Sequence, residues 1–140
     1  MADIGKAIRL RLLNDGDVTD NVGTRIYPRV VPQGVANPCV RYQTISSFRD
    51  GALDGGTGMV TATVQVDVFA DTHLAAELVS EKIRESLQGF RGTASGVEVL
   101  GCTLTNSREM YTKPVDASDD GDYRVVMDFE VVHQETIPTH

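Results

Sequence analysis

The stretch MVTATVQVDVFA, residues 59–70, constrains the fold more than any other part of the chain. Apolar side chains occupy every second position: Val60, Ala62, Val64, Val66 and Val68. The positions between them are mostly polar. Because successive side chains of a strand point to opposite faces, this pattern predicts a long strand with one buried face. The fold must therefore contain a sheet and a layer that covers it.

Four further segments have strand character. They are residues 25–31, 39–48, 97–105 and 123–134. The last of them repeats the alternation, with Tyr123, Val125, Met127, Phe129 and Val131 on one face. Three segments rich in Gly, Asp or Asn, namely 14–23, 49–58 and 116–122, are predicted to be loops.

Two segments carry the pattern of a surface helix, residues 3–13 and residues 72–88. Asp3 is a suitable N-cap for the first, and Asp71 or Thr72 for the second. The second helix places Ala75, Val79, Ile83 and Leu87 on one face. The element order α-β-β-β-α-β-β predicts an α+β fold, a largely antiparallel sheet of four to five strands with two helices packed on one face.

The length and the charge of the chain limit the functions that it can have. A chain of 140 residues is expected to form one domain, here residues 1–134, followed by a C-terminal tail, residues 135–140. The net charge of −7 is uneven: residues 1–49 carry +3 and residues 50–140 carry −10. A surface with this excess of negative charge is not suited to bind the phosphates of nucleic acid. The N-terminus lacks the pattern of a secretory signal, and no apolar run is long enough for a bilayer, so we expect a cytoplasmic product.

Prolines interrupt the segment RIYPRVVPQGVANPCVRYQTIS, residues 25–46. Pro28, Pro32 and Pro38 cannot donate to a sheet ladder, and proline is tolerated only at strand starts, edges and bulges. The segment is therefore predicted to form edge strands. Unprotected edges pair with other chains, so these prolines would restrict pairing to one neighbour and one register.

No motif in the chain indicates catalysis. GGTG, residues 55–58, leads into a strand rather than a helix and lacks the Gly-Lys pair of a phosphate loop. The three histidines fall on separate elements without ligand spacing, and no serine lies in a nucleophile elbow. Cys39 and Cys102 are expected to be reduced and buried. We therefore predict no enzyme activity, no catalytic residue, no cofactor and no metal site.

If the chain were an enzyme, Asp67 and Asp128 would be the best candidates for its catalytic residues. Both lie within predicted strands, on the faces opposite the apolar ones. Paired carboxylates perform acid–base chemistry when one is desolvated. The alternative is a structural role, in solvent or beside a cross-strand arginine such as Arg124.

The whole pattern resembles a known family, the tail-completion or tail-terminator proteins of long-tailed phages and gene transfer agents. The resemblance lies in the order and spacing of short segments through nearly the whole chain. These are RIYP (25–28), PQG (32–34), PCVRYQ (38–43), LDG (53–55), VQVDVFA (64–70), LQGFRG (87–92) and YRVVMDFEV (123–131). Cys39 departs from the family pattern, which has an aromatic residue there.

This resemblance implies a structural protein of the virion tail, located at its head-proximal end and assembled in the host cytoplasm. Such proteins form a hexameric ring on the last ring of the tail tube. They end tube polymerisation and present a surface to the head-side stopper or connector protein. DNA crosses the channel without specific binding, and no membrane is involved. The family has no catalytic residues to transfer to this chain.

Three sets of residues are then expected to serve assembly. The acidic loop, Asp116, Asp119, Asp120 and Asp122, is expected to face the lumen and repel DNA. The segment 49–58, with Arg49, Asp50 and Asp54, is expected to form a mobile arm that orders against a neighbour. Arg25 and Tyr27 on the proline-rich edge are expected to contact another subunit. Leu74 and Leu78, a second apolar edge of the 72–88 helix, would contact a subunit or pack in the core.

Two other functions are compatible with the sequence. One is another neck component, such as a head–tail stopper or a tail-tube-like subunit. The other is a small cytoplasmic enzyme or ligand-binding domain that uses Asp67 and Asp128.

Overall fold

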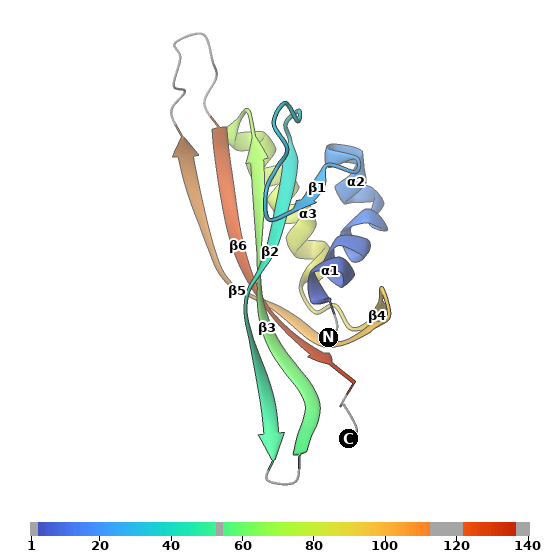
Figure 1. Ribbon diagram of the computed structural model, residues 1–140. Coiled ribbons are helices and arrows are strands. Elements are labelled where there is room, and N and C mark those ends of the chain that lie inside the picture. Colours follow the sequence, from blue (N-terminus) through green and yellow to red (C-terminus); the bar gives the residue numbers. More distant parts are fainter. Residues whose placement is uncertain (1–2, 53–54, 113–121, 137–140) are drawn as a thin grey trace.

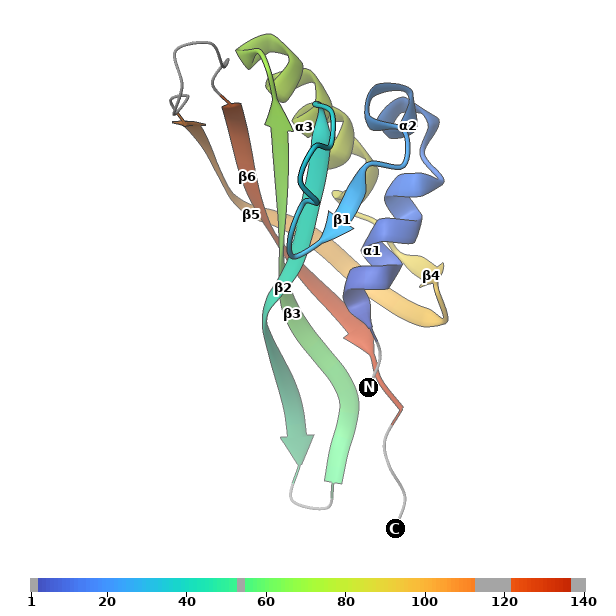
Figure 2. The same cartoon turned by 45° about the horizontal axis from the view of Figure 1, so that its top comes forward.

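A computed structural model describes residues 3–52, 55–112 and 122–136. One curled sheet forms the body of the molecule, and its helices all lie on the same side of it (Figures 1 and 2). In chain order the elements are α1 (Ile4–Leu13), α2 (Gly16–Val22), β1 (Ile26–Pro28), β2 (Cys39–Ala52), β3 (Gly55–Ala70), α3 (His73–Leu87), β4 (Gly92–Ala94), β5 (Val97–Thr112) and β6 (Asp122–Gln134).

The sheet has the strand order β1-β2-β3-β6-β5-β4. Every neighbouring pair is antiparallel except β1 and β2, which are parallel. The α+β class and the largely antiparallel sheet are as the sequence predicted. The described part has six strands and three helices, where four to five strands and two helices were expected.

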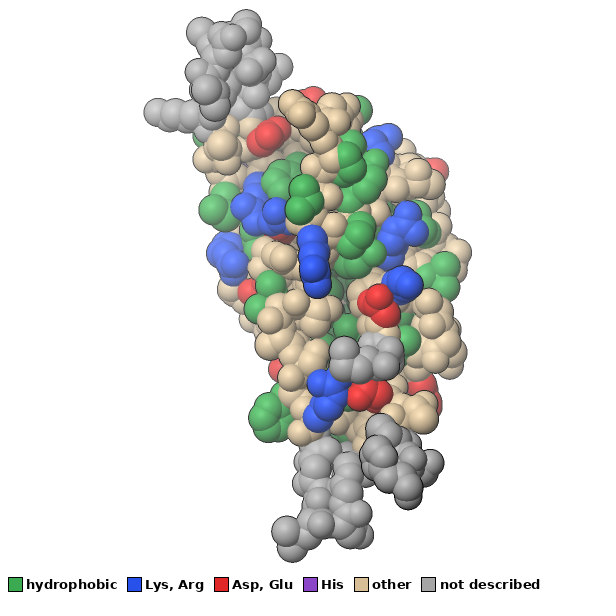
Figure 3. Space-filling model, in the orientation of Figure 1, with side chains coloured by type: hydrophobic (Ala, Val, Ile, Leu, Met, Phe, Trp, Pro, Cys, Tyr) green, Lys and Arg blue, Asp and Glu red, His purple; other side chains and the backbone are tan. Residues whose placement is uncertain are grey.

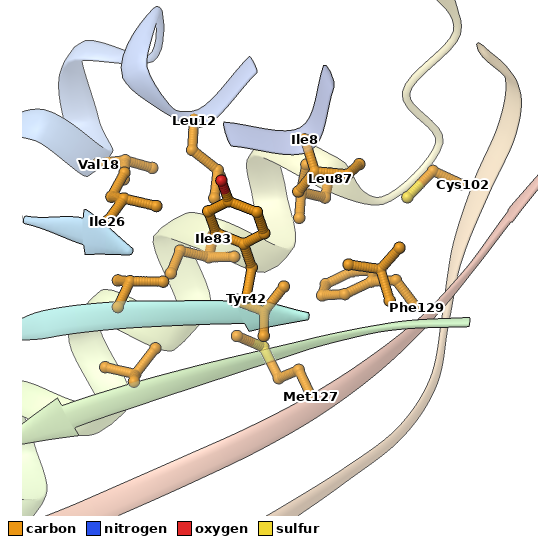
Figure 4. Packing of buried hydrophobic residues seen from close by; sticks show 14 of the residues in the cluster. Ile8, Leu12, Val18, Ile26, Tyr42, Ile83, Leu87, Cys102, Met127 and Phe129 are labelled. Atoms are coloured by element: carbon orange, nitrogen blue, oxygen red, sulfur yellow. The ribbon is translucent and has the colours of Figure 1, made fainter. Parts of the chain in front are cut away.

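The two strands with the strongest alternation form the centre of the sheet. β3 and β6 are hydrogen-bonded neighbours, with Val64 opposite Phe129 and Val66 opposite Met127. All five apolar positions predicted for β3 are buried, as are Val125, Met127, Phe129 and Val131 of β6. Side chains of the helices, including Ile8, Leu12, Ile83 and Leu87, close the core from above (Figure 4).

The prediction of a loop over residues 14–23 was wrong, because α2 forms there. The Asp15 side chain caps it by accepting a hydrogen bond from the Asp17 amide at 3.0 Å. Val18 and Val22, one turn apart, are both fully buried. This apolar pair drives the helix to pack, although the segment is otherwise rich in Asn, Asp and Gly. Gly23, with a φ of 59°, follows as the C-cap.

The glycine-rich segment 49–58 is not a loop either. β2 continues to Ala52 and β3 begins at Gly55, and these two residues are paired with each other. β5 similarly extends to Thr112, seven residues beyond the predicted end. The short strand β4 had no sequence signal, because Gly92 and Thr93 are exposed and only Ala94 is buried.

The edge-strand prediction for residues 25–46 was half right. β1 is an edge strand, and it ends at Pro28 rather than at residue 31. The first part of β2, however, lies between β1 and β3, because Val40 and Tyr42 pair with both neighbours. From Gln43 onward, β3 is the one strand of the described residues that pairs with β2, and there β2 forms the edge of the sheet.

Candidate assembly surface

The end of the β2–β3 hairpin projects beyond the helices. β6 pairs with β3 only as far as Met59, so the last paired positions of the hairpin, Gly51–Gly56 and Ala52–Gly55, have no third strand beside them among the described residues. Residues 46–49 of β2 pair with residues 60–63 of β3 and form the edge of the sheet there. We call residues 45–52 and 55–59 the hairpin arm. Both ribbon views show it extending away from the helical layer at one end of the sheet (Figures 1 and 2). The described apolar side chains of the arm, Ile45, Phe48 and Met59, are exposed and lie outside the core, which makes the arm a candidate contact surface.

The arm carries exposed apolar side chains. Phe48 is 76% exposed and Ile45 is 52% exposed. A register shift between Thr44 and Ser46 places Ile45 in a β-bulge, which turns the strand and changes which side chains face the core. Phe48 lies opposite Thr61, on the sheet face away from the helices. This surface could not be predicted from the sequence, because a bulge interrupts the alternation of buried and exposed side chains from which a strand's faces are predicted.

An ion pair fixes the base of the arm. Arg49 donates from Nε and Nη2 to the two carboxylate oxygens of Glu135, at 2.9 and 3.1 Å. The Glu135 amide also donates to the Gly58 carbonyl. Two parallel bonds of this kind hold a guanidinium in a defined orientation. Arg49, predicted as an interface residue, therefore links the arm to the end of β6 within its own chain.

The edge of α3 provides a second apolar surface. The Thr72 side chain caps this helix by accepting from the Ala75 amide at 3.1 Å. Ala76, Val79, Ile83 and Leu87 face the core. Leu74 and Leu78, one turn apart, are 76% and 48% exposed. The core-packing alternative for these two leucines is therefore excluded, and they remain candidates for a subunit contact.

A buried carboxylate organises the sheet face without helices. The Asp67 side chain is 1% exposed and lies between Arg41 of β2 and Arg124 of β6. Arg124 donates to Asp67 Oδ2 at 2.9 Å, and Arg41 donates to the same oxygen. Gln65 donates to the other oxygen at 2.9 Å. The structural alternative for Asp67, with Arg124 as its partner, is the one that the structure bears out.

Basic and apolar groups are interspersed around this carboxylate. The Arg41 and Arg124 guanidinium carbons lie 5.5 and 5.4 Å from the centre of the Phe69 ring, within the range of cation–π attraction. Asp128 in turn pairs with Arg108 at 3.2 Å. Figure 3 shows Lys and Arg side chains among hydrophobic ones over one face of the molecule. Because each aspartate accepts from an arginine, neither resembles a free general base.

The remaining predicted residues lie apart from one another. Arg25 donates to the carbonyls of Pro38 and Asn21 in its own chain. Tyr27 is half-buried beside a shallow hollow of about 420 Å³ that is also lined by α1. Asp122 is exposed and accepts a hydrogen bond from Asn37 at 3.0 Å. The side chain of Asp50, and all of Asp54, Asp116, Asp119 and Asp120, fall outside the described residues.

Comparison with known proteins identifies the chain. The family model for tail completion protein gp17 matches residues 6–134. The chain belongs to this family. Its membership of this family makes the protein a structural component of the phage-type virion tail. An enzyme that uses Asp67 and Asp128 is accordingly disfavoured.

Solved structures agree with the family at the level of the fold. One chain from the virion of a native gene transfer agent particle superimposes with a TM-score of 0.70 and 17% sequence identity, covering 93% of this tail completion protein and 94% of that chain. A second solved chain has a TM-score of 0.53 and 15% identity, and 99% of both chains is covered. No functionally curated protein matches the sequence.

One cluster of polar residues in this tail completion protein was not predicted from the sequence. His73 and Glu77 on α3 meet Glu109 on β5. The first two have the i, i+4 spacing that places side chains on one helix face, which was a usable signal. The third lies 36 residues from His73 and is brought there only by the sheet. Among the described residues, no helix is long and apolar enough to cross a membrane.

Proposed function

We propose that this tail completion protein assembles as a ring of six subunits on the head-proximal end of the tail tube. The ring ends tube polymerisation and presents a surface to the head-side connector. Family membership supports the setting. The observation that carries the proposal is the presence of two separate apolar surfaces, the hairpin arm and the Leu74/Leu78 edge of α3, on a monomer with a complete core.

Two different surfaces favour a ring over a symmetric dimer. In a two-fold dimer the same patch meets itself, whereas a contact between two unlike patches repeats from subunit to subunit and forms a ring when the rotation between neighbours closes. The arm projects beyond the body of its own chain (Figure 1). In this proposal Phe48 and Ile45 of one subunit pack against Leu74 and Leu78 of the next.

The acidic loop is assigned to the channel. Asp122, its described member, is exposed at the start of β6. Residues 50–140 carry a charge of −10, and carboxylates that face a channel repel the phosphates of passing DNA. We therefore place Asp116, Asp119, Asp120 and Asp122 toward the lumen, with Arg25, Tyr27, Arg49, Asp50 and Asp54 at or near subunit contacts.

Assembly on tubes tests the proposal. The purified protein is sized by light scattering, alone and with polymerised tail tubes, and the tube ends are imaged by electron microscopy. We expect a six-fold ring at one end of each tube and no further tube growth. Binding along the tube wall, or a tube that continues to elongate, would contradict the proposal.

Position in the particle separates the terminator from other neck proteins. A head–tail stopper would bind the head connector without tail tubes, and a tube-like subunit would polymerise into long stacks. A single ring that first requires the tube end is expected only for the terminator. A map of that ring with residues 116–122 on the outer rim would contradict the channel assignment alone.

A further inference from the structure

Three ligand-type side chains converge where α3 faces the outer half of β5. His73 is the first residue of α3, Glu77 lies one turn later, and Glu109 extends from β5. One nitrogen or oxygen from each lies within 4.8 Å of the other two. All three side chains are about half exposed, so each can adjust its position. The cluster is distinct from the arm and from the Asp67 network.

The spacing matches that of a small tetrahedral metal site. His73 Nε2 lies 3.2 Å from Glu109 Oε2 and 3.7 Å from Glu77 Oε1. Ligand atoms about 2.0–2.1 Å from a tetrahedral Zn²⁺ lie roughly 3.3 Å from each other. Two of the three edges are therefore close to the required length. The ligand oxygens of the two glutamates lie within 4.8 Å of each other.

Aromatic rings wall one side of the cluster. The His73 imidazole meets the Tyr123 ring edge-on, with centroids 6.1 Å apart, and Tyr111 packs on Tyr123 at 4.7 Å. These rings and His73 line a hollow of about 190 Å³ that Glu109 also borders. His73 Nε2 lies near the two glutamates while the ring contacts Tyr123. Two carboxylates within 4.8 Å of each other repel, and a positive charge between them relieves that repulsion.

We propose that His73, Glu77 and Glu109 bind a Zn²⁺ ion. One imidazole nitrogen and two carboxylate oxygens form a ligand set suited to zinc, whereas Ca²⁺ and Mg²⁺ take oxygen ligands alone. Three protein ligands leave the fourth position to solvent or to a side chain of a neighbouring molecule. The ion connects α3 to β5 beyond the core and thereby fixes the outer half of β5. The site does not depend on the proposed ring.

Calorimetric titration of the tag-free chain with ZnCl₂, after dialysis against a chelator, tests the site. We expect one ion per chain, and no comparable heat with MgCl₂. H73Q and E109Q should each weaken zinc binding by more than about tenfold, the lower end of what even an outer-shell partner contributes. E77Q should do the same. Zn²⁺ should raise the Tm of the wild-type chain and leave that of H73Q unchanged.

Two control variants test whether the loss of any glutamate charge, or of any histidine, is enough to weaken zinc binding. E98Q removes an exposed glutamate from the same strand as Glu109, and H140A removes a histidine outside the described residues. Both should bind zinc as the wild type does. All variants change exposed or terminal side chains, and circular dichroism checks that they fold. Equal binding by wild type and H73Q, or an absence of zinc binding at neutral pH, would overturn the proposal.

Discussion

Asp67 and Arg124 form an ion pair between the two central strands, on the sheet face opposite the helices. The two residues are diagonal neighbours, because Asp67 lies opposite Val126 and Arg124 lies opposite Phe69. Val126 is fully buried under this network. The face thus has an interior of its own without a helical layer, built from arginine stems, Phe69 and one desolvated carboxylate.

Neutralising this carboxylate should destabilise the chain. In D67N, Arg41 and Arg124 would face each other without the anion between them. We expect a loss of roughly 2–3 kcal/mol in the free energy of unfolding, below the ~3–5 kcal/mol typical of a broken buried pair. The reduction arises because these arginine side chains remain 22% and 24% exposed. Urea unfolding measures the change.

D128N is the matched control. Asp128 and its partner Arg108 are more exposed, so this change should cost less than about 1 kcal/mol. The double variant R41M/D67N should be more stable than D67N alone, because it removes one of the two unpaired charges. Equal stability of D67N and D128N would show that the Asp67 network is not structural.

His133 should make the fold sensitive to acid. Burial lowers the pKa of this side chain, and this effect exceeds the opposite contributions of a backbone hydrogen bond at Gln134 and of Glu135. Below pH of about 6.5 the unfolded chain binds a proton at His133 that the folded chain does not. Stability should therefore fall as the pH decreases from about 6.5 to the folded-state pKa, by at most about 1.4 kcal/mol per pH unit.

The variant H133L should lack this contribution. Unfolding curves between pH 5 and pH 8 compare the slope of stability against pH in the two proteins. H73Q, which changes a surface histidine, should retain the slope that depends on His133. If H133L and the wild type lose stability in parallel, the acid sensitivity comes from other groups.

The two cysteines should resist modification in the folded chain. Burial raises the pKa of the Cys102 thiol to about 12 and also raises the pKa of Cys39. At pH 8 only about one Cys102 side chain in 10⁴ would then be a thiolate, which is the reactive form. Ellman's reagent should label neither thiol until denaturant is added. F48C, which adds an exposed thiol, should react at once and with unit stoichiometry.

The central sheet was predictable because its signal is local and strong. The period-2 patterns of β3 and β6 identify the buried faces directly, and Asp67 was correctly associated with a cross-strand arginine. α2 was not predictable in the same way. Its apolar content is only Val18 and Val22, so burial against other elements decides its conformation, and propensity does not.

The candidate surfaces required the three-dimensional structure. Leu74 and Leu78 have the spacing of a core stripe, and only the packed helix shows that they face outward. Phe48 is directed outward by a bulge that no local rule locates. Glu109 lies beside His73 only because the pairing of β3 with β6, and of β6 with β5, brings the two residues together. In each case the sequence supplies the residue type, and long-range pairing supplies its neighbours.

Removing the exposed aromatic side chain of the arm, Phe48, should prevent assembly and leave the fold intact. F48D changes a side chain that is largely in solvent, so its free energy of unfolding should change by less than about 0.5 kcal/mol. Loss of a central aromatic contact typically costs about 2 kcal/mol or more in an interface. Tube-end binding should therefore weaken by roughly 30-fold or more. S47A, a change at the adjacent position, should bind tube ends like the wild type.

The contact between unlike surfaces makes a prediction for mixtures. L74E/L78E should fold normally and fail to form rings, because it lacks the α3 surface but keeps the arm. F48D lacks the arm and keeps the α3 surface. Under conditions in which the wild type forms rings, a mixture of the two variants has one intact pair of surfaces and should form heterodimers that cannot grow.

Light scattering and native mass spectrometry distinguish these species. Each variant alone should remain monomeric, and the mixture should show a 1:1 complex of about 30 kDa, twice the 15.2 kDa chain mass. E85Q, an exposed change on the same helix, should assemble as the wild type does. Because each variant lacks one of the two unlike patches, a mixture that forms full rings would show that the arm and the α3 edge do not meet. If the mixture stays monomeric while E85Q assembles, the two surfaces contact other partners, and the subunit contact lies elsewhere on the chain.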